Sequence, residues 1–214
     1  MATKYTFLIW LFLYPALALS QNGSVPSNQI KLSAEQLINP TNWGVKLSYE
    51  RSYLLNRLST EIGGTILIPY SSDYRQNGFR THVSQKYFYY RKGIHQYVGV
   101  GYEYQLSSFS DVDYFTDSTL AEFPYKGVED EYTGQKELHI VNLLWGFQII
   151  KNHFVFEFGG GIGIKYRNVE HFDRANPDYE MVRPRHPNFN YSSMVESEGF
   201  HINFPITVKI GYVF

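Results

Sequence analysis

The C-terminal segment Phe200–Phe214 alternates between apolar and polar side chains almost without interruption. Because successive side chains of a β-strand point to opposite faces, this alternation predicts a strand with one apolar and one mostly polar face. The segment is long for a soluble strand, whose usual length is about 5–6 residues. A tilted strand that crosses a bilayer needs about 9–11 residues, so the length favours a membrane-spanning strand.

The alternation recurs along the rest of the chain, nearly as regular in Phe154–Tyr166 and less regular elsewhere. Five further segments are predicted to be strands: 43–51, 58–68, 80–90, 97–106 and 139–149. An eighth candidate is Gln29–Ile38, where a short helix is the competing interpretation because Ser33 and Gln36 have capping-box spacing. In the last segment Pro205 has no N–H to donate, so we expect a local bulge there.

The connections between these eight segments fall into two length classes. The second, fourth and sixth are short turns, whereas the third, fifth and seventh are longer; only the first, at 39–42, breaks the rule. Short turns at one rim and longer loops at the other are typical of an outer-membrane barrel with periplasmic short turns. The sequence therefore predicts an all-β, eight-stranded antiparallel up-and-down transmembrane β-barrel in the cell outer membrane, with long extracellular loops at 107–138 and 167–199.

The N-terminal residues 1–20 have the features of a secretory signal peptide. Lys4 supplies the positive start, Phe7–Leu19 is apolar, and Ala18–Ser20 is a small-x-small cleavage site. A membrane-spanning helix is the alternative, but the apolar run is short for a span and no stop-transfer charges follow it. We therefore expect a signal peptide at 1–20, a periplasmic linker at 21–28 and the barrel domain at 29–214.

Composition supports this fold and excludes several classes of function. Aromatic residues make up 18% of the chain, and strands favour aromatic side chains. The formal net charge of −1 argues against a nucleic-acid partner, which would require a basic excess. Cysteine is absent, which excludes disulfides, thiolate zinc sites and thiol nucleophiles. No cofactor is expected, since the glycine run 159–163 lacks the ending of a phosphate-binding loop.

Several segments carry a resemblance to a known family: Leu47–Arg51, Leu58–Glu61, Lys86–Tyr90, Tyr97–Tyr102 and Ile210–Phe214. Together they resemble the small outer-membrane β-barrel proteins of the Bacteroidetes group. The resemblance implies an integral barrel inserted by the outer-membrane barrel assembly machinery, which reads an aromatic C-terminal strand. Tyr212 and Phe214 match that pattern and would form the assembly signal. Most relatives have no defined activity, so the resemblance does not supply a function.

The faces predicted to point inward carry charges of both signs, at Lys46, Glu50, Glu61, Lys86, Glu103, Glu157, Lys165 and Lys209. The lumen of an eight-stranded barrel is just wide enough to be filled by side chains. An isolated buried charge costs several kcal/mol, so we predict that these residues form an ion-pair network. Such a network leaves no wide solute channel. A catalytic carboxylate or a proton path is the alternative interpretation.

Three hypotheses for function follow. We expect a structural or interaction barrel rather than an enzyme; its partners would be outer-membrane lipid and an unidentified protein bound by the loops 107–138 and 167–199. The alternatives are a narrow small-solute channel and a barrel-type lipid-modifying enzyme. The enzyme would need Ser, His and an acid at the bilayer rim, and the candidates are His171 with Ser192 or Ser193.

A metal site is not expected either. Asp111, Asp113 and Glu122 partly match the spacing of a calcium-binding loop, but Thr116 stands where the sharp turn needs glycine. A solvated acidic loop is the favoured interpretation of this segment.

Overall fold

The computed structural model describes residues 28–35, 44–54, 56–67, 75–90, 94–116, 128–174, 180–181 and 197–214. The predicted signal peptide and nearly all of the predicted linker lie outside these residues. The described strands are β1 (Asn28–Glu35), β2 (Gly44–Tyr53), β3 (Leu58–Leu67), β4 (Arg75–Tyr90), β5 (Ile94–Thr116), β6 (Val128–Lys151), β7 (Phe154–Phe172), β8 (Glu180–Met181), β9 (Ser197–Asn203) and β10 (Ile206–Val213).

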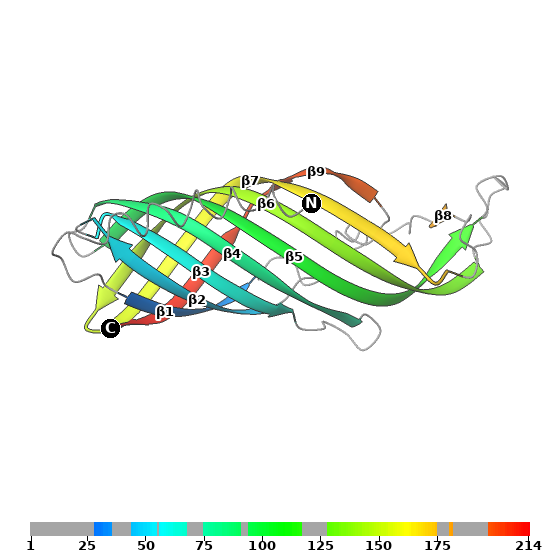
Figure 1. The fold of residues 1–214 in the computed structure, drawn as a ribbon, viewed down its shortest axis with the longest axis horizontal. Coiled ribbons are helices and arrows are strands. Elements are labelled where there is room, and N and C mark those ends of the chain that lie inside the picture. Colours follow the sequence, from blue (N-terminus) through cyan, green and yellow to red (C-terminus); the bar gives the residue numbers. More distant parts are fainter. Residues whose placement is uncertain are drawn as a thin grey trace, which may run out of the picture.

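The strands form one closed antiparallel barrel (Figure 1). Strands β1 to β7 lie side by side in chain order, and β10 closes the circle by pairing with both β7 and β1. At this seam the backbone N–H of Phe214 donates to the carbonyl of Asn28 at 2.9 Å. Because β9 and β10 follow one another along β7, they act together as the eighth strand. The predicted eight-stranded antiparallel barrel is confirmed, and residues 28–35 form a strand and not a helix.

Side chains alternate between the lumen and the outer surface along every long strand. In β2 the outward residues are exposed and the inward residues are buried, including Lys46 and Glu50. The outward apolar side chains surround the barrel as a belt, whose members include Leu47, Ile62, Val98, Leu143, Trp145, Phe156, Ile164, Ile202 and Ile210. This arrangement, apolar outside and polar inside, is the reverse of a soluble barrel and is typical of a transmembrane one.

Two short turns at one end of the barrel are described. The turn between β2 and β3 contains Leu54 and Asn56 with φ of 50° and 60°, and the turn between β6 and β7 contains Asn152 with φ of 57°. Asparagine tolerates this left-handed conformation better than most side chains, so it suits turns of this kind. Both turns lie in connections that the sequence predicts to be short turns, the second and the sixth.

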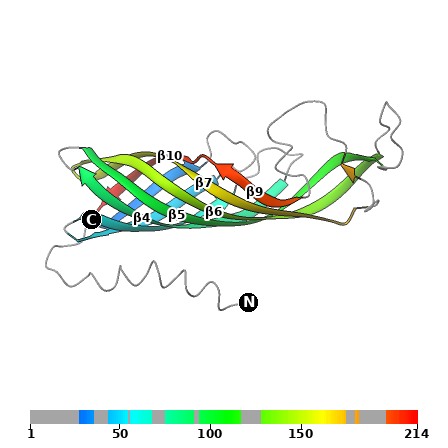
Figure 2. The same ribbon diagram turned by 90° about the horizontal axis from the view of Figure 1, so that it is seen from above.

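At the other end, β5, β6 and β7 extend well past the remaining strands (Figures 1 and 2). They contain 23, 24 and 19 residues, against 10 each in β2 and β3. We call residues 107–116, 128–138 and 167–172 the extension. The prediction that 107–138 and 167–199 are loops is wrong for these residues and for 180–181 and 197–199, which are strand. Asp111 and Asp113 pair with Tyr132 and Asp130 in β6, so they do not form a calcium loop; Glu122 lies outside the described residues.

The polarity of the alternation is inverted in the extension. Its buried inward side chains include the apolar residues Phe109, Tyr132, Leu138 and Val169, beside the polar residues Ser107, Lys136 and Arg167. Its exposed outward side chains are polar except for Phe172 and include Ser108, Glu131, Gln135 and Glu170. A strand with its apolar side chains inside and its polar side chains outside is typical of a sheet that meets water on its outer face. The extension therefore has its own small apolar core.

Pro205 interrupts the last strand without shifting its register. Before the interruption Asn203 pairs with Gly163, and after it Ile206 pairs with Gly160. The two residues between these pairs, Phe204 and Pro205, are thus matched by two residues on β7, Gly161 and Ile162. The predicted bulge is wrong, because no residue is inserted: the missing N–H of Pro205 ends the ladder locally and leaves the count unchanged.

Candidate functional site

A cluster of six charged side chains fills the lumen near the short turns. Three are glutamates, Glu50 on β2, Glu61 on β3 and Glu157 on β7; three are lysines, Lys31 on β1, Lys86 on β4 and Lys209 on β10. All six are buried, and the exposed fraction of each glutamate is 0%. We call these six residues the ion-pair cluster. Their formal charges sum to zero.

Lys86 is the central cation of the ion-pair cluster. Its Nζ lies 2.7 Å from Glu50 Oε2, 2.6 Å from Glu61 Oε2 and 2.8 Å from Glu157 Oε1. The three donors of one ammonium group are thereby directed at three different carboxylates. Lys86 also lies 4.9 Å from the centroid of the Tyr97 ring, within the range of a cation–π contact.

The other two lysines complete the neutralisation of the glutamates. Lys31 donates to Glu50 Oε2 at 2.6 Å and also to Glu157 Oε2. Lys209 donates to Glu61 Oε1 at 2.7 Å and lies 3.3 Å from Glu157 Oε1. Glu50 and Glu61 are direct cross-strand partners, and like charges in such positions repel unless cations lie between them. The lysines therefore make this pair of glutamates compatible with the fold.

Neutral groups satisfy the remaining acceptors of the glutamates. Gln148 Nε2 donates to Glu157 Oε2 at 2.7 Å, and the Tyr97 hydroxyl donates to Glu157 Oε1 at 2.9 Å. His82 Nε2 lies 3.2 Å from Glu61 Oε1. Buried ion pairs repay the cost of desolvation only when their remaining lone pairs are hydrogen-bonded in this way. The ion-pair cluster meets that condition.

The three carboxylates have oxygens within 4.8 Å of one another, a spacing that could suit a metal ion. In this structure the lysine ammonium groups hold the cationic positions, each within hydrogen-bond distance of the carboxylates. A divalent ion would have to displace them and leave buried lysines without partners. The arrangement therefore fits a neutral structural plug and not a metal centre.

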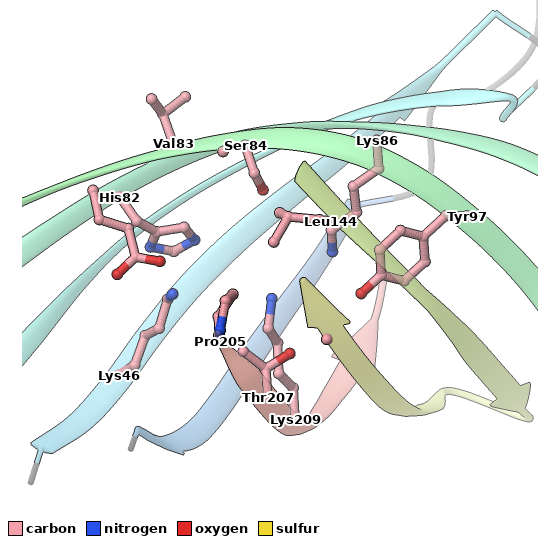
Figure 3. A pocket seen from close by; sticks show the side chains of 13 residues that line it. Lys46, His82, Val83, Ser84, Lys86, Tyr97, Leu144, Pro205, Thr207 and Lys209 are labelled. Carbon is pink, nitrogen blue, oxygen red and sulfur yellow. The ribbon is translucent and has the colours of Figure 1, made fainter. Parts of the chain in front are cut away.

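A small cavity of about 30 Å³ adjoins the ion-pair cluster (Figure 3). Lys46, Lys86 and Lys209 point into it from β2, β4 and β10, and the rings of His82 and Tyr97 line it as well. A volume of this size holds one or two water molecules. This cavity therefore does not accommodate a larger solute.

Five of the eight residues predicted for the lumen network meet in the ion-pair cluster: Glu50, Glu61, Lys86, Glu157 and Lys209. The other three lie elsewhere in the lumen. Lys46 is buried beside the cavity, and Glu103 accepts from Asn142 Nδ2 at 3.2 Å. Lys165 lies farther from the short turns, with His201 as its cross-strand partner.

Lys31 belongs to the ion-pair cluster, although it is not among the residues predicted for the network. Its position was visible, since it lies on the polar face of the first segment. A short helix is the competing interpretation of that segment, and a helix would not place Lys31 in the lumen. Tyr97 and Gln148 were missed because neutral side chains gave no charge signal.

A row of aromatic rings crosses the outer surface where the belt ends and the extension begins. Tyr104, His139, Tyr166 and Phe200 are successive cross-strand partners on β5, β6, β7 and β9. Their ring centroids lie 5.1, 6.2 and 5.3 Å apart in that order. Aromatic girdles of this kind mark the interfaces of a membrane barrel, so the row fits the outer boundary of the belt.

Two further sets of predicted residues are placed by the structure. Tyr212 and Phe214 point outward beside the seam with exposed fractions of 48% and 60%, and Tyr212 packs edge-on against Phe154. His171 lies inside the extension, 4.5 Å from the Tyr132 ring by centroids. It therefore does not face the outer surface, where a lipid-modifying site would be. Ser192 and Ser193 lie outside the described residues.

No family model matches the chain, and no curated protein matches its sequence. Among the residues that the structure describes, no helix is both long and apolar enough for a membrane span. In the search of solved structures, the chain is similar to a major outer membrane protein from Thermus thermophilus, with 10% sequence identity and a TM-score of 0.48. The similarity covers 89% of this chain and 100% of that one.

Proposed function

We propose that this protein is an integral outer-membrane β-barrel whose plugged lumen makes it a structural or interaction protein and not a pore. The observation that carries the proposal is the pairing of an apolar outer belt with a buried, neutral ion-pair cluster. The belt suits contact with lipid tails, because transfer of apolar side chains from water to hydrocarbon is favourable. The ion-pair cluster closes the lumen at the level of the belt.

The extension is the part of the molecule best suited to contact a partner. It carries polar outward side chains on three long strands and projects past the aromatic row, away from the short turns (Figure 2). A stiff sheet presents a contact surface with less loss of conformational entropy than a flexible loop. We assign the interaction role to this surface and its connecting segments, and we expect the partner to be another protein.

Single-cysteine labelling in intact cells tests the membrane topology, and the chain suits it because it contains no native cysteine. Gln135→Cys places a thiol on the exposed outer face of the extension, and Lys151→Cys places one at a short turn. A membrane-impermeant maleimide should label the first variant in intact cells and the second only after the outer membrane is permeabilised. Equal labelling of both in intact cells would contradict the proposal.

A further inference from the structure

Four cations lie together in the lumen farther from the short turns than the ion-pair cluster. They are Arg80 on β4, Lys136 on β6, and Lys165 and Arg167 on β7. Arg80 on β4 pairs with Gln105 on β5, which pairs with Leu138 on β6. Leu138 in turn pairs with Arg167 on β7, so these four inward positions form one row across β4 to β7. Lys136 and Lys165 are each two residues from that row on the same inward face. We call these four residues the cation cluster.

Few carboxylates balance this charge among the side chains that the structure describes. Glu103 is the nearby acid; its Oε2 lies 4.0 Å from Arg80 Nη1, and its Oε1 already accepts from Asn142. Arg80 donates from Nε and Nη2 to Gln105 Oε1 at 3.1 and 2.6 Å. This acceptor is a neutral amide, so it does not neutralise the guanidinium charge. Arg80 and Arg167 make other contacts as well. The four cations and Glu103 carry a summed formal charge of +3.

Lys136 is the member of the cation cluster that most requires an anion. Only 3% of its surface is exposed, and none of the described residues forms an ion pair or hydrogen bond with its ammonium group. It lies in the extension, beyond the belt. Burial, followed by the charges of Lys165, Arg167 and Arg80, lowers the pKa of Lys136 to about 7. A buried cation without an anion is costly, so this position is stable only if a negative group joins it or the lysine loses its proton.

We propose that the cation cluster is a binding site for a phosphate-type oxoanion. A tetrahedral, doubly charged oxoanion offers enough acceptors for two guanidinium groups and two ammonium groups at once, and arginine favours such ligands through paired hydrogen bonds. Lys165 is only partly buried, and its cross-strand partner His201 on β9 is exposed, so the cation cluster contacts solvent on this side. The same chemistry is presented by free phosphate and by the phosphomonoester headgroup of a lipid.

Titration calorimetry on the full chain refolded in neutral detergent tests the site, with sulfate and inorganic phosphate as probes. Both should bind saturably to the wild-type barrel. Lys136→Met should weaken binding by about tenfold or more, as expected when one partner of a buried charge contact is removed. Lys151→Met is the matched control on the same strand: Lys151 is exposed at a short turn, and its loss should leave binding unchanged.

The pH dependence of sulfate binding gives a second readout, because sulfate itself does not titrate near neutrality. The charged and titratable groups at inward positions on the strands around Lys136 are Arg80, Glu103, Lys165, Arg167, His171 and His201, with Asp111, Asp113 and Asp130 farther along β5 and β6 toward the end of the extension. A bound anion favours protonated Lys136, so sulfate should bind more weakly at about pH 8.5 than at about pH 7, where half of the lysine is charged. Lys136→Met should abolish this dependence, which distinguishes the lysine from His171 and His201.

Three outcomes would overturn the proposal: no binding of either probe, equal binding to Lys136→Met, or a lower thermal stability of Lys136→Met without anion. The last would show that Lys136 already has an anionic partner within the chain, because removing an unpaired buried charge should raise stability. Vesicles with and without phosphatidic acid separate the two ligand sources. Competition by phosphatidic acid vesicles supports a lipid headgroup; binding of free phosphate unaffected by them supports the soluble ion.

Discussion

Replacement of Lys86 by methionine would test the ion-pair cluster at its centre. Methionine is similar in length but carries no charge, so Lys86→Met leaves three buried glutamates with two lysines and a net charge of −1. Lys86 donates to all three carboxylates at 2.6–2.8 Å. Removing one partner of a buried ion pair typically costs about 3–5 kcal/mol, because the other partner stays buried and unneutralised. We expect a loss of that size in the free energy of unfolding.

Urea unfolding in lipid vesicles, followed by tryptophan fluorescence, measures this loss; Trp145 faces the surroundings on the belt. Lys151→Met is the control, and its effect should stay within about 0.5 kcal/mol because Lys151 is exposed. Glu50→Gln in the Lys86→Met background restores neutrality. The double variant should therefore be more stable than the sum of the single effects by about 1–3 kcal/mol. A loss below about 1 kcal/mol for Lys86→Met, or strict additivity, would refute the reasoning.

Three other predictions concern the belt, the extension and the lumen. Leu143→Arg places a charge on the belt and should lower the free energy of unfolding in urea by about 2–4 kcal/mol. Gln135→Arg on the extension should lower it by about 0–1 kcal/mol. Equal losses would show that both positions lie in water. Gly134→Val should cost about 1–3 kcal/mol, because the Phe109 ring lies where the new side chain would go, while Gly199→Ala, with no atom within 4 Å of its new Cβ, should be nearly neutral. The wild-type barrel should carry no steady current in planar bilayers, and sustained conductance would show that the ion-pair cluster opens.

The eight strand cores could be found from the sequence because a membrane barrel imposes a strict demand on each of them. Every second residue of the belt meets an apolar environment, so segments such as Phe154–Tyr166 carry an uninterrupted alternation. Most of the charged residues of the lumen followed from the same pattern, since the opposite face must hold the polar groups. Hydropathy periodicity is therefore informative wherever lipid would surround the strand.

The ends of the long strands could not be found in the same way. In the extension the apolar positions switch to the inward face, as Phe109 and Leu138 show, and the outward positions become polar. Ser107, Asp111 and Asp113 therefore suggested a solvated loop, although they belong to a paired strand. The cation cluster was missed for a related reason: it joins residues from three strands, and their mutual proximity depends on register, which alternation alone does not specify.

The short strand β8 (Glu180–Met181) has a consequence for how copies of this protein behave beside one another. Past Ser110, no described residue of β4 pairs with β5, and β8 pairs with Phe115 and Thr116 on this side. An exposed strand edge offers unpaired N–H and C=O groups that can recruit a strand from another molecule. By occupying the tip of that edge, β8 shortens the stretch available for such intermolecular joining, and the projecting sheet is less able to aggregate in a crowded membrane.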